Sequence, residues 1–233
     1  MKPYPEDVKA RLVREGREIM ARYPEGHSRS ALLPLLHLVQ SEDGFVSANG
    51  IELCSELLGI SPAEVSAVAT FYTQYKRRPN GEYNVGVCTT SLCAVMGGDE
   101  IWETVCDHLG IGNGETTADG KVTLEAIECN AACDFAPVVM VNWEFFDNQT
   151  PQSAVKLVDD LRAGNPVQPT RGPNHVPTFK ENEHLLAGFE DGLADEGESA
   201  GVPTLLGKRI AAEKGWGIPS DPGWSAPEAK EGE

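Results

Sequence analysis

The sequence that decides the fold is Val85-Gly-Val-Cys88-Thr-Thr-Ser-Leu-Cys93, together with Ile127-Glu-Cys129-Asn-Ala-Ala-Cys133. Each cysteine pair follows a segment rich in alternating apolar residues, which is typical of a short strand. The first segment contains Tyr83, Val85 and Val87, and the second contains Val122, Leu124 and Ile127. The pattern predicts two strands that deliver four thiols to one end of a sheet.

The residues around these pairs predict the rest of a small domain over residues 82–165. A helix is expected over about 99–109, where apolar residues recur at helical spacing. Residues 138–141 form an apolar run typical of a buried strand, and Phe145-Phe146 is its expected hairpin partner. A last helix is expected from Thr150-Pro151 to Gly164. The order predicts a sheet with helices on its faces.

Residues 1–81 predict a helical bundle, because four segments have helical spacing and clear boundaries. The expected helices begin near residue 5, near 28–30, at 48 and at 62. The last has the strongest start, since Ser61 can cap it, Pro62 suits the first helical position and Glu64 completes a capping box. This helix is expected to run to about residue 74. We expect the bundle to dock on a partner protein.

Residues 166–233 predict an extended or disordered tail. This segment holds eight of the sixteen prolines and ten of the twenty-four glycines, a composition that does not build its own core. Trp216 and Trp224 favour the alternative that the tail wraps around a partner subunit and becomes ordered there.

Composition limits the class of protein. The net charge is −17, and residues 82–165 hold three basic and fourteen acidic side chains, so a nucleic-acid partner and an anionic membrane surface are disfavoured. The sequence has no signal peptide and no apolar run of membrane-spanning length. In a reduced, cytosolic protein, clustered cysteines indicate a metal site before they indicate disulfides.

The spacing of the cysteines favours an iron–sulfur cluster. Each iron of a two-iron cluster takes two protein sulfurs, which suits one C-x4-C pair and one C-x3-C pair. A zinc site with four cysteines is the main alternative, although zinc sites mostly use C-x2-C spacing. The chain has no C-x-x-C motif of a dithiol oxidoreductase. Cys54 and Cys106 lie on apolar stripes and are expected to be core thiols.

Five blocks of sequence resemble one known family. They are Val68–Tyr72 (VATFY), Val87–Cys93 (VCTTSLC), Gly114–Gly120 (GETTADG), Glu128–Cys133 (ECNAAC) and Ala136–Asn142 (APVVMVN). The family is the 24-kilodalton subunit family of respiratory complex I, whose bacterial members are designated E, and the resemblance covers about residues 5–165. It implies a thioredoxin-like 2Fe-2S ferredoxin domain after a helical bundle. It also implies that Cys88, Cys93, Cys129 and Cys133 bind one 2Fe-2S cluster.

The resemblance implies a function in electron transfer. The chain is expected to accept or store one electron in a bacterial NADH:quinone oxidoreductase, beside the subunit that binds FMN and NADH. The large iron–sulfur subunit of the peripheral arm is a second expected partner. The expected location is the cytoplasmic face of the plasma membrane, without direct membrane insertion. No nucleotide fingerprint or nucleophile–base pair is present, so no independent active site is expected.

Two other functions stay open from the sequence. The first is the equivalent diaphorase subunit of an NAD-linked hydrogenase or formate dehydrogenase, since the same module occurs there. The second is a zinc-binding helix-turn-helix regulator, because residues 47–73 have the spacing of such a motif. The expected reading helix, 62–74, contains no Arg or Lys, which disfavours DNA binding.

Overall fold

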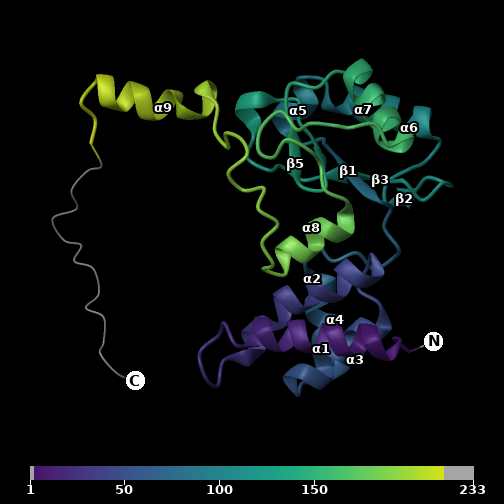
Figure 1. Cartoon of the computed structure of the whole chain (residues 1–233). Helices are drawn as coiled ribbons and strands as arrows, with labels where there is room; N and C mark the ends of the chain where they lie inside the picture. Colours follow the sequence, from purple (N-terminus) through teal and green to yellow (C-terminus); the bar gives the residue numbers. More distant parts are fainter. Residues whose placement is uncertain (1–2, 218–233) are drawn as a thin grey trace. The chain divides into compact units, whose positions relative to one another are not determined.

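The computed structural model describes residues 3–217, and the chain divides into two compact units (Figure 1). The first unit, residues 1–199, contains a helical bundle, a five-stranded sheet with its helices, and helix α8. The second unit, residues 200–233, contains helix α9 (Val202–Glu213) in its described part.

The predicted bundle is present as four α-helices and one 3-10 helix. They are α1 (Glu6–Met20), η1 (Ser28–Ala31), α2 (Leu32–Asp43), α3 (Ala48–Leu58) and α4 (Pro62–Phe71). Ser61 and Glu64 form the expected capping box at the start of α4, which satisfies amide groups that would otherwise lack partners. Helix α4 ends at Phe71 rather than near 74, because Gln40 of α2 accepts from the Lys76 amide and donates to the Gln74 carbonyl. After α4 the chain turns, with the Tyr75 amide donating to the Tyr72 carbonyl, and the Gln40 contacts hold this turn in place.

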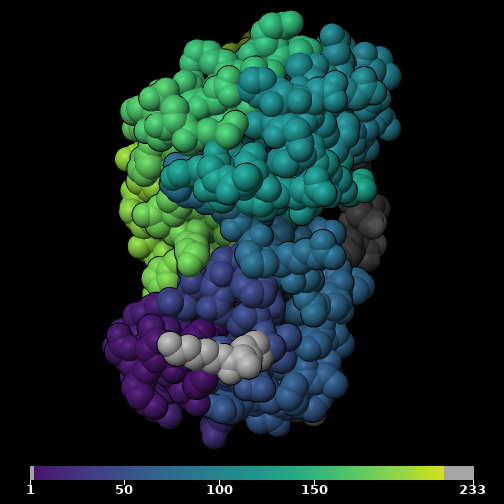
Figure 2. All heavy atoms as spheres, turned by 90° about the vertical axis from the view of Figure 1, so that its right-hand side faces the viewer, coloured from purple at the N-terminus to yellow at the C-terminus, as the bar shows by residue number. Residues whose placement is uncertain are grey.

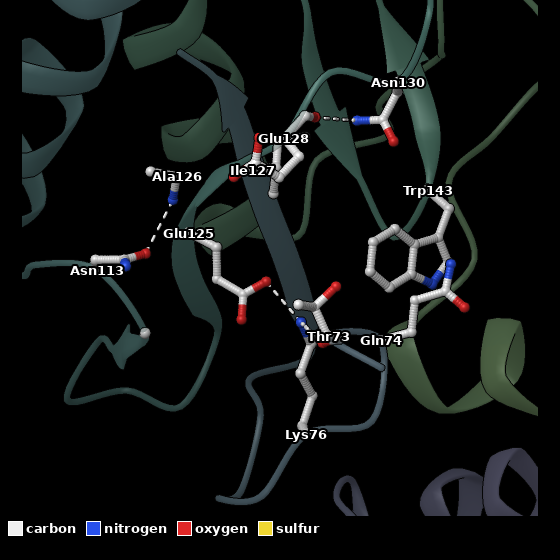
Figure 3. A pocket seen from close by; sticks show the side chains of 11 residues that line it. Thr73, Gln74, Lys76, Asn113, Glu125, Ala126, Ile127, Glu128, Asn130 and Trp143 are labelled. Atoms are coloured by element: carbon white, nitrogen blue, oxygen red, sulfur yellow. Dashed lines mark hydrogen bonds and ion pairs between the residues drawn. The ribbon is translucent and has the colours of Figure 1, made fainter. Parts of the chain in front are cut away.

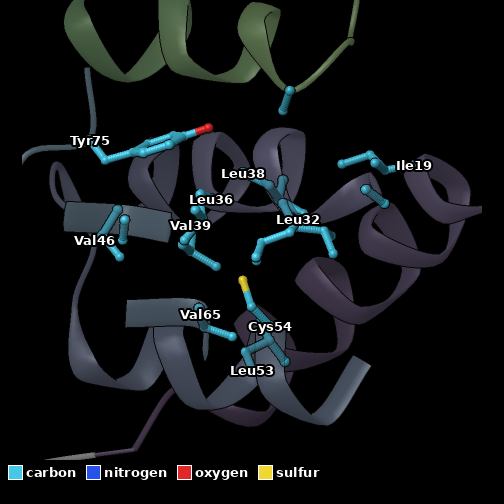
Figure 4. Close-up of a cluster of buried hydrophobic side chains, with 14 of the residues drawn as sticks. Ile19, Leu32, Leu36, Leu38, Val39, Val46, Leu53, Cys54, Val65 and Tyr75 are labelled. Atoms are coloured by element: carbon cyan, nitrogen blue, oxygen red, sulfur yellow. The ribbon is translucent and has the colours of Figure 1, made fainter. Parts of the chain in front are cut away.

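The core of the bundle is apolar and contains Cys54. Figure 4 shows the Cys54 sulfur among Leu32, Leu53 and Val65. The side chain is fully buried, and burial raises the pKa of this thiol to about 12. Cys54 is therefore a core thiol, as expected. Cys106 is half-buried against the core of the sheet domain, and burial raises its pKa as well.

The second core belongs to a mixed sheet with the strand order β2-β3-β1-β4-β5. The strands are β1 (Tyr83–Cys88), β2 (Glu115–Thr116), β3 (Val122–Ile127), β4 (Val139–Val141) and β5 (Glu144–Phe146). Strands β1 and β3 are parallel and in register, so that Cys88 pairs with Ile127 at their common end. Strand β4 is antiparallel to both β1 and β5. The two cysteine loops therefore leave the same end of the sheet, as predicted.

The two faces of the sheet have different roles. One face presents Val85, Val87 and Leu124 to helices α6 (Gly98–Leu109) and α7 (Pro151–Ala163), which lie together in Figure 1. The alternate residues of β1 and β3, such as Gly86 and Glu125, occupy the other face, as the period of a strand requires. Cys88 shares this second face.

Helix α8 (Phe179–Leu186) lies where the sequence predicts an extended or disordered tail, and that expectation is wrong for this segment. Phe179 and Glu183 of α8 are buried, and the helix packs on α2. The Asn182 side chain donates to the Asn142 carbonyl between β4 and β5. The helix packs against both the bundle and the sheet domain. The local composition of residues 166–233 does not predict these contacts.

Further polar contacts join the bundle to the sheet domain, whose surfaces meet in Figure 2. Nζ of Lys76, in the segment after α4, lies 2.6 Å from a carboxylate oxygen of Glu125 in β3. The Phe179 amide of α8, the helix that packs on α2, donates to the Glu82 carbonyl just before β1. The division at residues 81 and 165 stays a prediction, because both parts belong to the same compact unit.

Helix α9 was also not predicted. Its apolar side chains Val202, Leu205 and Leu206 are exposed within the second unit, as is Trp216 beyond its end. Trp224 lies outside the described residues. Among residues 3–217 no helix has both the length and the apolar character that a membrane span requires.

Candidate metal centre

The first cysteine pair is buried. Cys88 is the last residue of β1, and its amide donates to the Val138 carbonyl at 3.1 Å. Cys93 lies in α5 (Ser91–Val95), a short helix that the sequence analysis did not predict. The exposed fractions of these two residues are only 3% and 2%. Strand β1 and helix α5 thus hold two thiols inside the domain.

The second pair lies in the loop after β3. Cys129 is exposed in this loop, and Cys133 is exposed at the start of the 3-10 helix η2 (Cys133–Phe135). Their Sγ atoms are 3.4 Å apart. One pocket is lined by Cys88, Cys93, Cys129 and Cys133, with Asn130, Ala132 and Val138. The structure therefore brings the four predicted site residues together.

The thiols of the pocket perturb one another. The pKa of Cys93 is raised to about 11, first by burial and then by its hydrogen bond with Cys88, whereas the Val138 backbone acts in the opposite direction. The pKa of Cys133 is raised, chiefly by its hydrogen bond with Cys129. The raised pKa values of Cys93 and Cys133 favour the protonated form of these two thiols, and bound metal cations would displace the protons because thiolate is the ligand form.

The donor set fits a two-iron cluster. Cys88 is hydrogen-bonded to Cys93, and Cys129 contacts Cys133, so the pocket presents two pairs of thiols. Two pairs in one pocket match a cluster in which each iron takes two protein sulfurs.

Two backbone segments approach the cysteines of the pocket closely. Ala131, at a left-handed φ of 58°, directs its amide to the Cys129 Sγ at 3.3 Å. Gly98, at the start of α6, lies against the backbone carbonyls of Cys88 and Cys93. The close approach is to carbonyl groups.

Gly98→Ala tests this close approach. A Cβ at residue 98 would lie 2.5 Å from the Cys88 carbonyl oxygen and 2.8 Å from the Cys93 oxygen. Both neighbours are backbone atoms, so the thiol loop must move. We expect the free energy of unfolding to fall by about 1–3 kcal/mol, with weaker retention of iron, measured by urea titration and iron analysis. Gly207→Ala, in open space on α9, is the matched control and should leave both unchanged or slightly improved. Equal behaviour of the two variants would contradict the steric account.

A pocket of about 350 Å³, lined by both polar and apolar groups, adjoins the Cys129 loop, and the sequence did not predict it (Figure 3). Glu128 and Asn130 of this loop line it, together with the Lys76–Glu125 ion pair and Trp143. Trp143 has a left-handed φ of 73° in the two-residue turn between β4 and β5, where glycine is the usual residue. Asn142, the residue before Trp143, also has a left-handed φ of 48°, and asparagine is common at this position of a two-residue turn.

The fold and the thiol pocket together define a class of protein, and comparison with known families agrees. The family model of the thioredoxin-like [2Fe-2S] ferredoxins matches residues 16–162. The chain belongs to this family, and more narrowly to the group of NADH-quinone oxidoreductase subunits that are designated E in bacteria. The resemblance inferred from the five sequence blocks is confirmed.

The relatives place the chain within the family. The NADH-quinone oxidoreductase subunit designated E in Mycobacterium tuberculosis is 57% identical over 221 residues, which cover 94% of this chain and 86% of the relative. NADH-quinone oxidoreductase subunit 2 of Thermus thermophilus is 40% identical over 148 residues, covering 63% and 82%. These relatives are subunits of an oxidoreductase. Membership of their family removes the zinc-binding regulator as a competing function.

A solved structure shows the same fold in another complex. An NAD+-reducing [NiFe]-hydrogenase chain superposes with a TM-score of 0.53 at 22% identity, covering 58% of this chain. This chain spans only 23% of the hydrogenase chain. The likeness shows a common fold alone, and it does not favour the hydrogenase alternative over the quinone enzyme.

Proposed function

We propose that Cys88, Cys93, Cys129 and Cys133 bind one 2Fe-2S cluster, and that the chain stores or transfers one electron in an NADH:quinone oxidoreductase. The observation that carries this proposal is the pocket in which all four thiols meet. Family membership supports the type of cofactor. When bound, the cluster would supply reversible one-electron chemistry.

The residues of the pocket suit a negatively charged cofactor. Two ferric ions, two sulfides and four thiolates sum to a charge of −2, and reduction makes it −3. Backbone amides lower the free energy of such charge, and the amides near Cys93 and Cys129 come from Val138 and Ala131. The buried positions of Cys88 and Cys93 keep water from one side of the site.

Two observations support the proposed partners: the sequence lacks a nucleotide-binding fingerprint, and the relatives are named as subunits of an NADH-quinone oxidoreductase. The sequence has no nucleotide fingerprint, so hydride transfer would take place on a subunit that binds FMN and NADH. The large iron–sulfur subunit of the peripheral arm is the proposed second neighbour. In this proposal the chain belongs to a larger complex and lies at the cytoplasmic face of the plasma membrane.

Exposed apolar groups mark where a partner could dock. Phe71 at the end of α4 is 79% exposed, and Tyr72 beside it is also exposed. Tyr75, the next aromatic residue in the chain, is instead buried and donates its hydroxyl hydrogen to the Leu33 carbonyl. Phe71 and Tyr72 therefore remain the aromatic part of the proposed interface.

A reduction experiment tests the proposed function. NADH added to the cluster-loaded chain alone should leave the cluster oxidised, because the chain has no hydride site. NADH added together with the flavin subunit should reduce the cluster by one electron, measured by the appearance of an EPR signal. Reduction by NADH without the flavin subunit, or no reduction with it, would contradict the proposal. Copurification from native membranes identifies the host complex.

Asp134→Asn tests how charge sets the reduction potential. Asp134 directly follows Cys133, and its negative charge contributes to the raised pKa of that thiol. A unit charge about 10 Å away, at a dielectric constant of about 20, opposes reduction by roughly 1–2 kcal/mol, and about 1.4 kcal/mol corresponds to 59 mV. We expect the midpoint potential to rise by some tens of millivolts at low salt and less at high salt.

Redox-titrated EPR measures this shift. Asp107→Asn is the matched control, since it removes the same charge from an exposed position near the far end of α6. Its effect should be smaller. A midpoint that is unchanged or lowered in Asp134→Asn would remove the electrostatic explanation.

A further inference from the structure

The four thiols of the pocket differ in how far solvent reaches them. Cys88 and Cys93 are buried, whereas Cys129 and Cys133 are exposed. The exposed sulfurs are also neighbours, because their Sγ atoms lie only 3.4 Å apart. A small reagent in solution therefore reaches the second pair more readily than the first, and the two sulfurs that it reaches are already in contact.

The backbone between the exposed cysteines can bring their sulfurs closer. Residues 128–132 form a loop between the end of β3 and the beginning of η2. Ala131 is left-handed within this loop, and its amide donates to the Cys129 Sγ. The chain curls so that Cys129 and Cys133 face each other. A disulfide needs the sulfurs to approach to about 2.05 Å, and an exposed loop can take up this shift without moving a strand.

We propose that Cys129 and Cys133 are a site of reversible oxidation, at which a low-molecular-weight disulfide converts them to an intramolecular disulfide when no cluster is bound. One cysteine thiolate attacks a sulfur of the small disulfide, breaks its S–S bond and releases one small thiol. The other cysteine then attacks the protein sulfur of the mixed disulfide and releases the second small thiol. The chain loses two electrons and two protons, and the small disulfide is reduced to two thiols.

The oxidised pair would control cluster loading. A disulfide removes two of the four proposed ligands, so iron and sulfide cannot be bound until a thiol reductant restores them. This consequence depends on the proposed function, since it matters only if the same thiols bind the cluster. The disulfide itself depends only on the contact between two exposed sulfurs.

Oxidation of the full-length, cluster-free chain by oxidised glutathione tests the first step. The reduced chain is incubated anaerobically and without metal, and thiols are then counted in denaturant. The count should fall from the six cysteines of the sequence to four, which is six minus two. Peptide mapping should find Cys129 linked to Cys133. A link between Cys88 and Cys93, or glutathione adducts without an internal disulfide, would overturn the proposal.

Two variants distinguish the internal disulfide from simple glutathionylation. Cys133→Ser should trap a glutathione adduct on Cys129, because the resolving thiol is gone. Cys106→Ser, which leaves the pocket intact, should form the internal disulfide at the wild-type rate. An unmodified Cys129 in the Cys133→Ser variant would count against its reactivity.

Cluster loading tests the second step, with iron content and visible absorption as readouts. The oxidised chain should bind almost no iron, and treatment with dithiothreitol should restore loading to the level of the reduced chain. Full loading of the oxidised chain without a reductant would overturn the proposed control. If the reduced chain also fails to load, the proposed function fails, while the mapped disulfide stands as a separate result.

Discussion

Replacing Cys129 by alanine is expected to abolish the visible absorption of the reconstituted cluster, and the same is expected for Cys88, Cys93 and Cys133. The pocket offers four thiols for four coordination positions, so each loss leaves one iron with one protein sulfur instead of two. Bound iron and sulfide should fall from about two of each per chain to near zero. Anaerobic reconstitution followed by iron and sulfide analysis measures this.

Variants of the two exposed cysteines, Cys129 and Cys133, best separate loss of ligation from loss of folding. Alanine at Cys88 or Cys93 also removes a buried side chain, whereas alanine at Cys129 or Cys133 changes an exposed loop. A loss of cluster in Cys129→Ala with unchanged circular dichroism is therefore a loss of ligation.

Two other cysteines provide matched controls. Cys54 lies in the bundle core, and Cys106 lies at the edge of the second core. Alanine at either position should leave the cluster spectrum unchanged. A normal spectrum in Cys129→Ala, or a lost cluster in Cys106→Ala, would make the ligand assignment wrong.

Glu183→Ala is expected to lower the free energy of unfolding by about 2–5 kcal/mol, the usual cost of a core cavity together with an unpaired buried polar group. The Glu183 carboxylate is fully buried in α8 and lies 2.6 Å from Nδ1 of His37 in α2. Alanine leaves the His37 nitrogen buried without this partner, and it also leaves a cavity. Urea unfolding measures the loss, and hydrogen exchange should show α8 opening before the rest of the bundle.

Glu183→Gln separates the hydrogen bond from the packing. Glutamine keeps the volume of the side chain and can still pair with the His37 ring, so the loss should be smaller than in Glu183→Ala. The other carboxylate oxygen, Oε1, has no hydrogen-bond partner in the described structure, which limits what the pair contributes. If both variants unfold within about 0.5 kcal/mol of the wild type, the range of a neutral surface substitution, the pair does not hold α8.

Several elements could be predicted because their signals are local. The capping box at Ser61 and Glu64 starts α4 through contacts three residues apart. Gly59 and Gly164 end their helices in the left-handed conformation that glycine favours. Strands β1 and β3 follow from alternating apolar residues, and their parallel pairing brings the cysteine loops to one end.

Other elements could not be predicted because their partners are distant in the sequence. Helix α8 is stabilised by the contact of Glu183 with His37 and by that of Asn182 with Asn142. Its surroundings, rich in proline and glycine, indicated an extended tail. The end of α4 was misplaced for the same reason, since Gln40 of α2 holds the chain that follows.

The sequence by itself predicted the four thiols as one site and an iron–sulfur cluster as its cofactor, because cysteine spacing within each pair is a local property and the two strands before the pairs are regular. Only the tertiary structure decided that Cys88 and Cys93 are buried while Cys129 and Cys133 face solvent. Exposure depends on which elements pack over a loop. The first cysteine pair is covered by Gly98 and Val138, which come from different segments of the chain. The packing of these segments is stabilised by contacts between residues far apart in the chain, so no local sequence pattern predicts it.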